Sequence, residues 1–157
     1  MTAKKRVITP IGMADRSKRS GLSETVDCLC AASRRAARSI TRAFDRELRP
    51  MGLRAPQFSI LAVLSLRGPT TIGELAKILS IERTTLTRNL ALIEARGWIR
   101  IRPGDDARAR IARITPKGTK TIVSAMPAWR AAQQDTIAAL GEPGALALRK
   151  LARRAQA

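Results

Sequence analysis

The order of the predicted elements places this chain in the mainly α class, with one short β-hairpin. Apolar residues recur at steps of three and four over much of the chain, which is typical of amphipathic helices. Two short helices with a tight turn between them occupy residues 70–96, and two strand candidates follow around a Pro-Gly-Asp-Asp turn at 103–106. This order predicts a winged helix-turn-helix with a two-stranded β-wing. Long N- and C-terminal helices flank it and are candidates for dimerisation.

The charge balance indicates a polyanionic partner. The chain has 157 residues, with 30 Lys and Arg against 12 Asp and Glu, and a formal charge of +18. Such a balance favours nucleic acid first and an acidic membrane surface second. A soluble protein from an arginine-rich genome would show a similar composition. Because basic residues also fall inside the helix-turn-helix segment, nucleic acid is the better interpretation.

Several function classes are excluded by the residues that are missing. The chain has no histidine and no tyrosine, and its two cysteines, Cys28 and Cys30, are too few for a zinc site. We therefore expect no enzyme, no metal and no cofactor. No run of about 18 apolar residues could span a membrane. The N-terminus is basic and has no apolar signal segment, which predicts a cytoplasmic protein with reduced thiols.

The chain divides into a predicted tail and one predicted domain. Residues 1–21 are polar and basic, and we expect a flexible tail there. Residues 22–157 form a single predicted domain whose DNA-binding part is about 56–115. Its first helix, 22–48, has an apolar face that includes Val26, Leu29 and Phe44, and so long a helix often packs against a second chain. Near the C-terminus, Pro127 should kink or split a helix, and residues 141–144 should separate a last short one.

The helix-turn-helix segment carries its own start signals and a polar outward face. Thr71 and Glu74 have the spacing of a capping box for the helix that follows. In the next helix, about 82–96, Leu86, Leu90 and Ile93 fall on one side, which leaves short hydroxyl side chains and arginine on the other. Such a face suits a helix in the DNA major groove. The candidate DNA contacts on it are Arg83, Thr84, Thr85, Thr87 and Arg88.

The hairpin that follows is basic. Residues 98–102 and 108–114 are the strand candidates, and Thr115 with Pro116 has the pattern of a helix cap and first position. A basic hairpin beside a groove-entering helix can reach a neighbouring groove or the phosphates. Its candidate DNA contacts are Arg102, Asp106, Arg108 and Arg110, although Asp106 could also be a simple turn-forming acid.

Six fragments in this order resemble the MarR family of bacterial winged-helix regulators, over roughly residues 22–132. The resemblance implies an obligate homodimer, joined through its first and last helices, on a pseudo-palindromic operator in double-stranded DNA. It also implies that Arg108 enters the minor groove, braced by a charge-assisted hydrogen bond that it donates to Asp106. The fragments are Pro56-Gln57-Phe58, Glu74-Leu75-Ala76, Thr85-Leu86-Thr87-Arg88, Glu94-Ala95-Arg96-Gly97, Asp106-Ala107-Arg108-Ala109 and Ile114-Thr115-Pro116-Lys117-Gly118.

The resemblance also suggests how DNA binding could be controlled. Many family members bind small phenolic or aromatic effectors, but the aromatic residues of this chain are more typical of a core. Cys30 lies 26 positions before Pro56, a spacing similar to that of the reactive cysteine in the family's organic-hydroperoxide sensors. Those sensors support their thiolate with tyrosines, which this chain lacks. Cys30 is therefore either a redox sensor or a small buried thiol without a role.

Two function hypotheses follow from these features. The first is a sequence-specific, homodimeric transcriptional regulator, most often a repressor, released from its operator by a small ligand or by thiol oxidation. The alternative is a basic nucleoid-type protein that binds DNA regardless of sequence. They differ in the ratio of specific to non-specific affinity and not in net charge.

The hairpin assignment predicts the effect of two substitutions. Arg108→Ala should weaken operator binding by about 1–3 kcal/mol and leave the fold intact. Asp106→Ala should reproduce part of that loss, because it frees the arginine and does not delete it. Titration of a labelled operator measures both variants. Parental affinity in both would refute the assignment of the hairpin.

Overall fold

Helices and one small sheet make up the chain, which the computed structural model describes over residues 24–104 and 109–154. The predicted tail, Asp106 and Arg108 lie outside the described residues. The chain divides into two compact units, residues 1–38 and 39–157. In the first unit the described part is a 3-10 turn, η1 (Glu24–Asp27), and the beginning of helix α2 (Leu29–Leu48).

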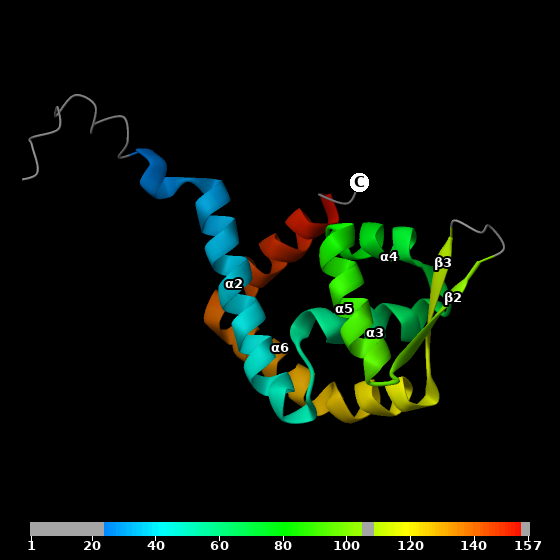
Figure 1. The fold of residues 1–157 in the computed structure, drawn as a ribbon. Helices are drawn as coiled ribbons and strands as arrows, with labels where there is room; N and C mark the ends of the chain where they lie inside the picture. The colour runs from blue at the N-terminus through cyan, green and yellow to red at the C-terminus, as the bar shows by residue number, and fades with distance from the viewer. Residues whose placement is uncertain (1–23, 105–108, 155–157) are drawn as a thin grey trace, which may run out of the picture. The chain divides into compact units, whose positions relative to one another are not determined.

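The second unit contains the end of α2 and all later elements, as Figure 1 shows. The mainly α winged helix-turn-helix predicted from the sequence is confirmed. In chain order the elements after α2 are η2 (Arg49–Met51), α3 (Ala55–Arg67), β1 (Thr70–Thr71), α4 (Ile72–Leu79), α5 (Arg83–Ala95), β2 (Ile99–Pro103), β3 (Arg110–Ile114) and α6 (Pro116–Arg154).

The first helix begins later than the sequence suggested. The periodicity predicted one helix over 22–48, whereas α2 begins at Leu29 after the 3-10 turn. Cys28 is the residue between them, and its carbonyl accepts the first helical hydrogen bond, from the N–H of Ala32 at 2.9 Å. Asp27 and Cys28 both have low helix propensity, which favours a break at this point.

The end of α2 is joined to the winged helix by polar contacts. Asp45 Oδ1 accepts the N–H of Ala55 at 2.7 Å, so a side chain of α2 satisfies an unpaired donor at the start of α3. Arg96, just after α5, donates to the carbonyl of Gly52, in the turn that follows α2. Its guanidinium carbon also lies 4.9 Å from the ring centroid of Trp98, a cation–π distance.

The helix-turn-helix is formed by α4 and α5. The predicted capping box is confirmed at α4: Glu74 N–H donates to Thr71 Oγ1 at 3.2 Å, and Thr71 N–H donates to Glu74 Oε2 at 3.2 Å. Ser80 ends α4 in the left-handed region, with φ of 50°. This turn directs the chain into α5, whose Leu86, Leu90 and Ile93 are buried as predicted.

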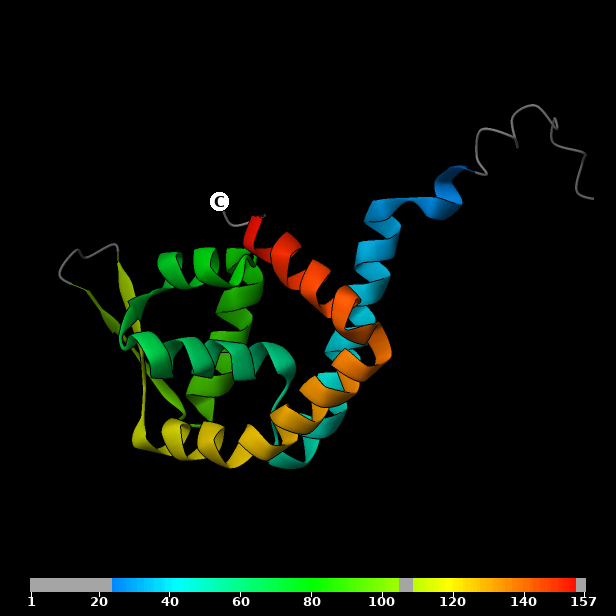
Figure 2. The same ribbon diagram turned by 180° about the vertical axis from the view of Figure 1, so that it is seen from behind.

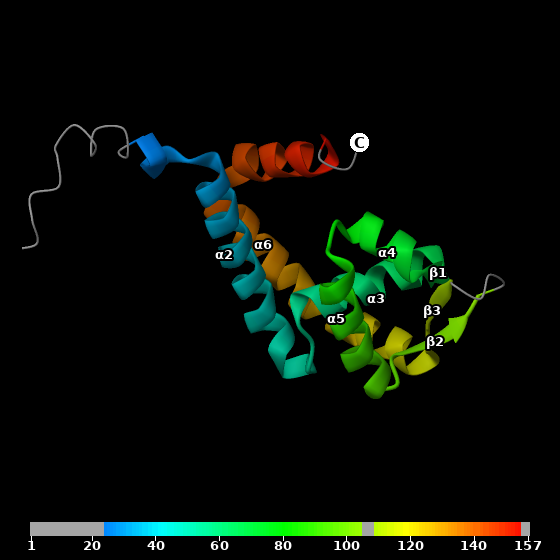
Figure 3. The same cartoon turned by 45° about the horizontal axis from the view of Figure 1, so that its top comes forward.

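The sheet is antiparallel and has three strands in the order β1-β3-β2, side by side in Figure 3. Its two long strands form the predicted wing, with Ile99 opposite Ile114 and Ile101 opposite Ala112. The additional strand β1 pairs Thr70 with Ala112. With only two residues it has no periodicity to detect, so only the tertiary fold shows it.

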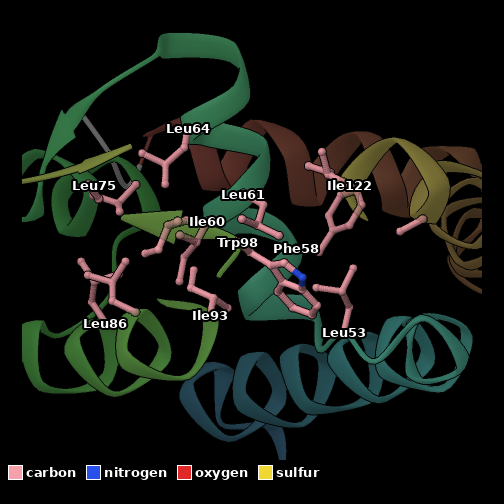
Figure 4. Packing of buried hydrophobic residues seen from close by; sticks show 14 of the residues in the cluster. Leu53, Phe58, Ile60, Leu61, Leu64, Leu75, Leu86, Ile93, Trp98 and Ile122 are labelled. Carbon is pink, nitrogen blue, oxygen red and sulfur yellow. The ribbon is translucent and has the colours of Figure 1, made fainter. Parts of the chain in front are cut away.

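The core lies between α3, α4, α5, the sheet and the first part of α6, as Figure 4 shows. Leu residues of all three helices interlock there, and Trp98 lies near Phe58 and Leu53. Burial of each such leucine contributes roughly 1.5–3 kcal/mol. The side chains that are almost completely buried are Leu48, Leu53, Ile60, Leu61, Leu64, Leu75, Leu86, Leu90, Ile93 and Ile99.

The two ends of the wing meet at the carbonyl of Trp98. Gly97 ends α5 with φ of 72°, a left-handed conformation that glycine adopts without strain. The Trp98 carbonyl then accepts the N–H of Thr115 at 3.0 Å. Thr115 Oγ1 donates to the Gly97 carbonyl at 2.7 Å and accepts the N–H of Gly118 at 3.1 Å, as expected of a helix cap. We call these residues, 97–98 and 115–118, the wing base.

Helix α6 is interrupted at Gly141, not at Pro127. Helical geometry continues through Pro127, and Gly141 is the non-helical residue, with φ of 68° and ψ of 157°. The split predicted at Pro127 is therefore wrong, and the break predicted near residues 141–144 is confirmed; Figure 2 shows the turn between the orange and red parts of α6. Pro127 removes the helical partner of the Val123 carbonyl, but Val123 is exposed, so water can replace that bond. Among the described residues no helix is long and apolar enough to cross a membrane.

The wing base predicts a strict requirement for glycine at position 118. A Cβ there would overlap the Trp98 carbonyl oxygen and lie 2.8 Å from Ile114 Cγ1. Gly118→Ala should therefore lower the free energy of unfolding by about 1–3 kcal/mol. Gly144→Ala is the control, because its nearest neighbour, Leu140 Cβ, would lie at an ordinary 3.5 Å. Urea denaturation compares them, and equal stability of the two variants would contradict the close approach.

Candidate nucleic-acid interface

The outward face of α5 presents the predicted polar set. Arg83, Thr84, Thr85, Thr87 and Arg88 are all exposed, and they occupy the first two turns of a 13-residue helix. The opposite face holds the helix to the core. The sequence alone therefore identified both faces of α5 correctly, because a single amphipathic helix obeys its own periodicity.

The hydroxyl groups on this face differ in what they already bind. Thr87 Oγ1 donates to the Arg83 carbonyl at 2.7 Å, so only its lone pairs remain for a ligand. The Thr84 and Thr85 hydroxyls make no hydrogen bond to a described residue. Each keeps a donor as well as an acceptor, which matches the mixture of both groups on base edges in the major groove.

One surface hollow brings the helix-turn-helix and the wing together. Arg83 and Thr87 of α5, Gly73 at the start of α4, and Arg110 of β3 line it, and its volume is about 340 Å³. A guanidinium group thus stands on each of two elements around one concave surface. This geometry suits a phosphate group of a nucleic-acid backbone.

Arg102, another predicted contact of the wing, does not line this hollow. Arg110 pairs with Pro103, on the sheet face that carries Ile101, whereas Arg102 pairs with Ile111 on the opposite face. The structure therefore unites Arg83, Thr87 and Arg110 but not Arg102. A site that used both Arg102 and Arg110 would have to include both faces of the wing.

Arg102 has two basic neighbours that sequence reasoning missed. Arg100 and Arg113 are directly opposite each other across β2 and β3, and both are exposed. Like charges in that position destabilise a sheet slightly, so an anionic partner would relieve the repulsion. Strand alternation would have placed Arg100 beside Arg102 on one face. The pairing with Arg113 needed the register, which the sequence did not reveal.

No carboxylate among the described residues forms an ion pair with Arg83, Arg88, Arg102 or Arg110. Within the described residues the ion pairs are Arg46–Glu47 at 3.0 Å and Arg54–Asp45 at 3.2 Å, and neither involves α5 or the wing. None of the described carboxylates therefore competes with a ligand for these four guanidinium groups. Such positive charge steers an anionic polymer toward α5 and the wing.

One carboxylate does stand at the edge of this surface. Glu74 Oε2 accepts a hydrogen bond from the Thr71 hydroxyl at 2.8 Å, and the Thr71 N–H donates a second one. The first bond most of all, and then the second, lower the pKa of Glu74 below its usual value, because both stabilise the ionised carboxylate. Glu74 therefore stays ionised at neutral pH. Its charge is held within the α4 cap, where it faces the positive end of the helix.

Glu94 links α5 to the wing, and sequence reasoning missed it. Strand β2 is an edge strand, with β3 as its neighbour, and Glu94 Oε1 accepts the N–H of Ile101 at 2.7 Å. The carboxylate is partly buried, so this charge-assisted bond is poorly screened. It holds the wing at a defined angle to α5. No local pattern signals it, because the two residues belong to different elements.

The cysteines and the aromatic residues are the candidates that remain. Cys28 and Cys30 are free and exposed, so the alternative of a buried thiol at Cys30 is wrong. No group of metal-ligating residues gathers among the residues that the structure describes. Phe44, Phe58, Trp98 and Trp129 are buried or half-buried in or against the core, as expected.

Comparison with known proteins finds similar transcriptional regulators. Residues 51–109 match a family model described as MarR family. The transcriptional regulator MosR of M. tuberculosis, solved in complex with DNA, is 41% identical; the match covers 83% of this chain and 97% of that one, with a TM-score of 0.72. Among curated proteins, an uncharacterised HTH-type regulator of Bacillus subtilis, YwoH, is 34% identical over 54% of this chain. The multiple antibiotic resistance protein MarR of Salmonella typhimurium is 35% identical over 49%.

The matches to the curated relatives are partial. They span 62% of the length of YwoH and 54% of that of the Salmonella protein. The match to MosR, by contrast, extends over almost all of that chain.

The Glu94 contact predicts a positioning effect on DNA affinity. Glu94→Ala should weaken binding to a cognate duplex by about 1 kcal/mol, because the wing loses its anchor to α5. Glu94→Gln is the matched control, since it removes the same charge but retains an oxygen that can accept from Ile101. Fluorescence anisotropy measures affinity, and hydroxyl-radical footprinting reports whether protection by the wing alone is lost. Equal affinities for the two variants would show that Glu94 acts through its charge.

Proposed function

Because the chain belongs to the MarR family of transcription regulators, we propose that it is a sequence-specific DNA-binding repressor. Regulators of this family bind DNA and are not enzymes. We further propose that this chain recognises a pseudo-palindromic operator as a homodimer in the cytoplasm. An effector is proposed to release it from the operator.

One observation carries the proposal: an exposed Thr and Arg face on α5 lies beside a basic wing, near the turn end of its strands. Arg83, Thr87 and Arg110 share one hollow, and none of the arginines is paired with a described carboxylate. A helix of 13 residues is about 20 Å long, and its first two turns can enter a major groove. The wing then extends along the DNA beside it.

Within this arrangement the contacts divide into two kinds. Thr84 and Arg88 face outward on α5 and are proposed to meet base edges, where arginine can bind guanine with two hydrogen bonds. Arg83, Arg102 and Arg110 are proposed to bind phosphates, and Thr85 and Thr87 to lie close to the groove wall. From the family resemblance, Arg108 is proposed to enter the minor groove with Asp106 as its brace.

Substitutions in α5 separate a specific regulator from a nucleoid-type binder. Arg88→Ala should weaken operator binding by about 1–3 kcal/mol and binding to a scrambled duplex by much less. Thr84→Val should affect the operator only, because a hydroxyl contributes little to non-specific binding. Paired titrations at one salt concentration measure both duplexes, since phosphate contacts depend strongly on salt.

A control substitution accounts for charge alone. Arg130→Ala removes an exposed arginine of α6 outside the proposed interface, so it should lower both affinities slightly and equally. If Arg88→Ala behaves like this control and Thr84→Val has no effect, the nucleoid-type function is the better account.

Unpaired apolar side chains support the proposed dimer. Val26 and Leu29 near the first helix are exposed, and so are Leu140, Leu146, Leu148 and Leu151 along the last part of α6. Exposed apolar side chains on both of these helices are the feature expected of a contact surface. The family resemblance assigns dimerisation to the first and last helices.

The dimer is tested by its mass in solution. Light scattering at micromolar concentration should give twice the mass of one chain. Leu148→Glu should shift the protein toward monomer, because it introduces a charge into an apolar contact. Lys150→Glu, which places the same side chain on an exposed charged residue of the same helix, is the control. A compact monomer of the parent protein would contradict the dimer.

Release from the operator is proposed to follow a small ligand or thiol oxidation. Cys30 and Cys28 are exposed and therefore accessible to an oxidant, which supports the second route. The chain has no tyrosine to support a thiolate at Cys30, unlike the hydroperoxide sensors that it resembles. A small aromatic or phenolic effector remains the other route.

A further inference from the structure

The end of α2 is attached to the DNA-binding part of the chain at two separate points. Asp45 of α2 accepts the N–H of Ala55, at the start of α3, through Oδ1 at 2.7 Å. Arg96, the residue directly after α5, donates to the carbonyl of Gly52, in the turn that follows α2. All four residues belong to the second compact unit. A single contact would leave α2 free to rotate about it, whereas two contacts on different elements oppose such rotation.

The attachment at Asp45 uses both oxygens of its carboxylate. Its side chain is only 19% exposed, and Oδ2 accepts a hydrogen bond from Arg54 Nη1 at 3.2 Å. The Arg54 N–H donates in turn to Gln57 Oε1 at 3.0 Å, so a residue of α3 itself satisfies that donor. The Ala55 N–H, by contrast, finds its acceptor on a different helix. Because Asp45 is mostly buried, this charge-assisted bond is poorly screened by solvent.

The attachment at Arg96 is supported by an aromatic ring. The guanidinium carbon lies 4.9 Å from the ring centroid of Trp98, whose side chain is part of the core. Gly52 has φ of 70°, and a Cβ there would lie 2.9 Å from Arg96 Nη1. The guanidinium therefore fills the space that a side chain at position 52 would need. A cation–π contact and a backbone carbonyl together hold this planar group.

Apolar packing alone would not hold this orientation. Leu48 at the end of α2 and Leu53 after the turn are almost completely buried, and they keep the two parts together. Apolar burial depends on area and has no preferred direction, whereas a hydrogen bond weakens steeply when its angle changes. The leucines therefore fix how closely α2 approaches the core, and the bonds of Asp45 and Arg96 fix its angle.

We propose that Asp45 and Arg96 are positioning residues that set the direction of α5 relative to α2 and thereby the separation of operator half-sites that the protein accepts. Neither residue is among the proposed DNA contacts. This inference rests on the proposed homodimer, in which the first helices of two chains meet and each α2 carries one α5 to the DNA. One additional base pair moves a half-site by about 3.4 Å and turns it by about 34–36°. A loosely attached α5 would follow that change, whereas a firmly attached one rejects it.

The attachment is tested first without DNA. Ser39 of α2 and Ala91 of α5 are exposed, so Ser39→Cys and Ala91→Cys can carry spin labels in a chain that also has Cys28→Ser and Cys30→Ser. Double electron–electron resonance measures the distance between the two labels. Dilution with unlabelled protein restricts the measurement to pairs within one chain. The parent should give a single narrow distribution of distances.

Loss of either attachment should broaden this distribution. Asp45→Ala and Arg96→Met remove the two attachments in turn without changing the buried leucines, and each should widen the distribution about twofold. Asp45→Asn is the matched control for the first variant, because its amide oxygen can still accept the Ala55 N–H and the distribution should stay narrow. Arg46→Ala is the control for a lost charge, since its ion pair with Glu47 lies within α2. Parental widths in both Asp45→Ala and Arg96→Met would overturn the proposal.

The spacing of half-sites then tests the consequence for DNA. A duplex selected from random sequence by the parent protein is lengthened or shortened by one base pair between its half-sites. The parent should bind these altered duplexes about tenfold more weakly, and Asp45→Ala and Arg96→Met should reduce that difference to about threefold or less. Binding to a single half-site should stay at the parental level. A general loss of stability would instead lower binding to all of these duplexes alike.

The outcomes separate this inference from the proposed function. An unchanged spacing preference in both variants, or a parent that binds the three spacings equally, would overturn the inference. If one variant does not fold, the other decides. If the parent selects no duplex, the proposed sequence-specific function fails and the spacing rule fails with it. The distances between the spin labels still decide in that case whether Asp45 and Arg96 hold α5.

Discussion

The closure of the wing base at the Trp98 carbonyl is the constraint on which the rest of the structure depends. One backbone oxygen receives the Thr115 N–H, and the same threonine caps α6 and binds the Gly97 carbonyl. These bonds join the end of α5, both strands of the wing and the start of α6 in a single joint. Glycine at 118 is required because the backbones approach so closely.

This joint explains how a small domain can present charge in a defined arrangement. Once the ends of the wing are closed, the strand register places Arg110 beside Arg83 and Thr87, while Arg100, Arg102 and Arg113 occupy the other face. Glu94 adds a second restraint between α5 and the edge strand. Backbone geometry therefore fixes where these arginines stand, and no described carboxylate pairs with them, so their charge is available for phosphates.

Much of the helical structure could be predicted from sequence, because caps and faces are local properties. Thr71 with Glu74, Thr115 with Pro116, and the buried series of Leu86, Leu90 and Ile93 all depend on residues within a few turns of one another. The predictions that were wrong concern where a single helix begins or breaks, because periodicity outweighed the low helix propensity of Asp27 and Cys28 and the cost of Pro127 was overstated. Pro127 did not split α6, and the break before α2 was read as continuous helix.

By itself the sequence determined the order of elements, the face that α5 turns outward, and the strong positive charge, since each follows from composition or from periodicity along one element. Only the tertiary structure decided which distant residues share a surface. The short strand β1, the separation of Arg102 from Arg110, the Glu94 bond to the wing and the Arg96 bond to the Gly52 carbonyl are such features. The physical reason is that strand register and helix packing bring together residues whose spacing along the chain carries no signal.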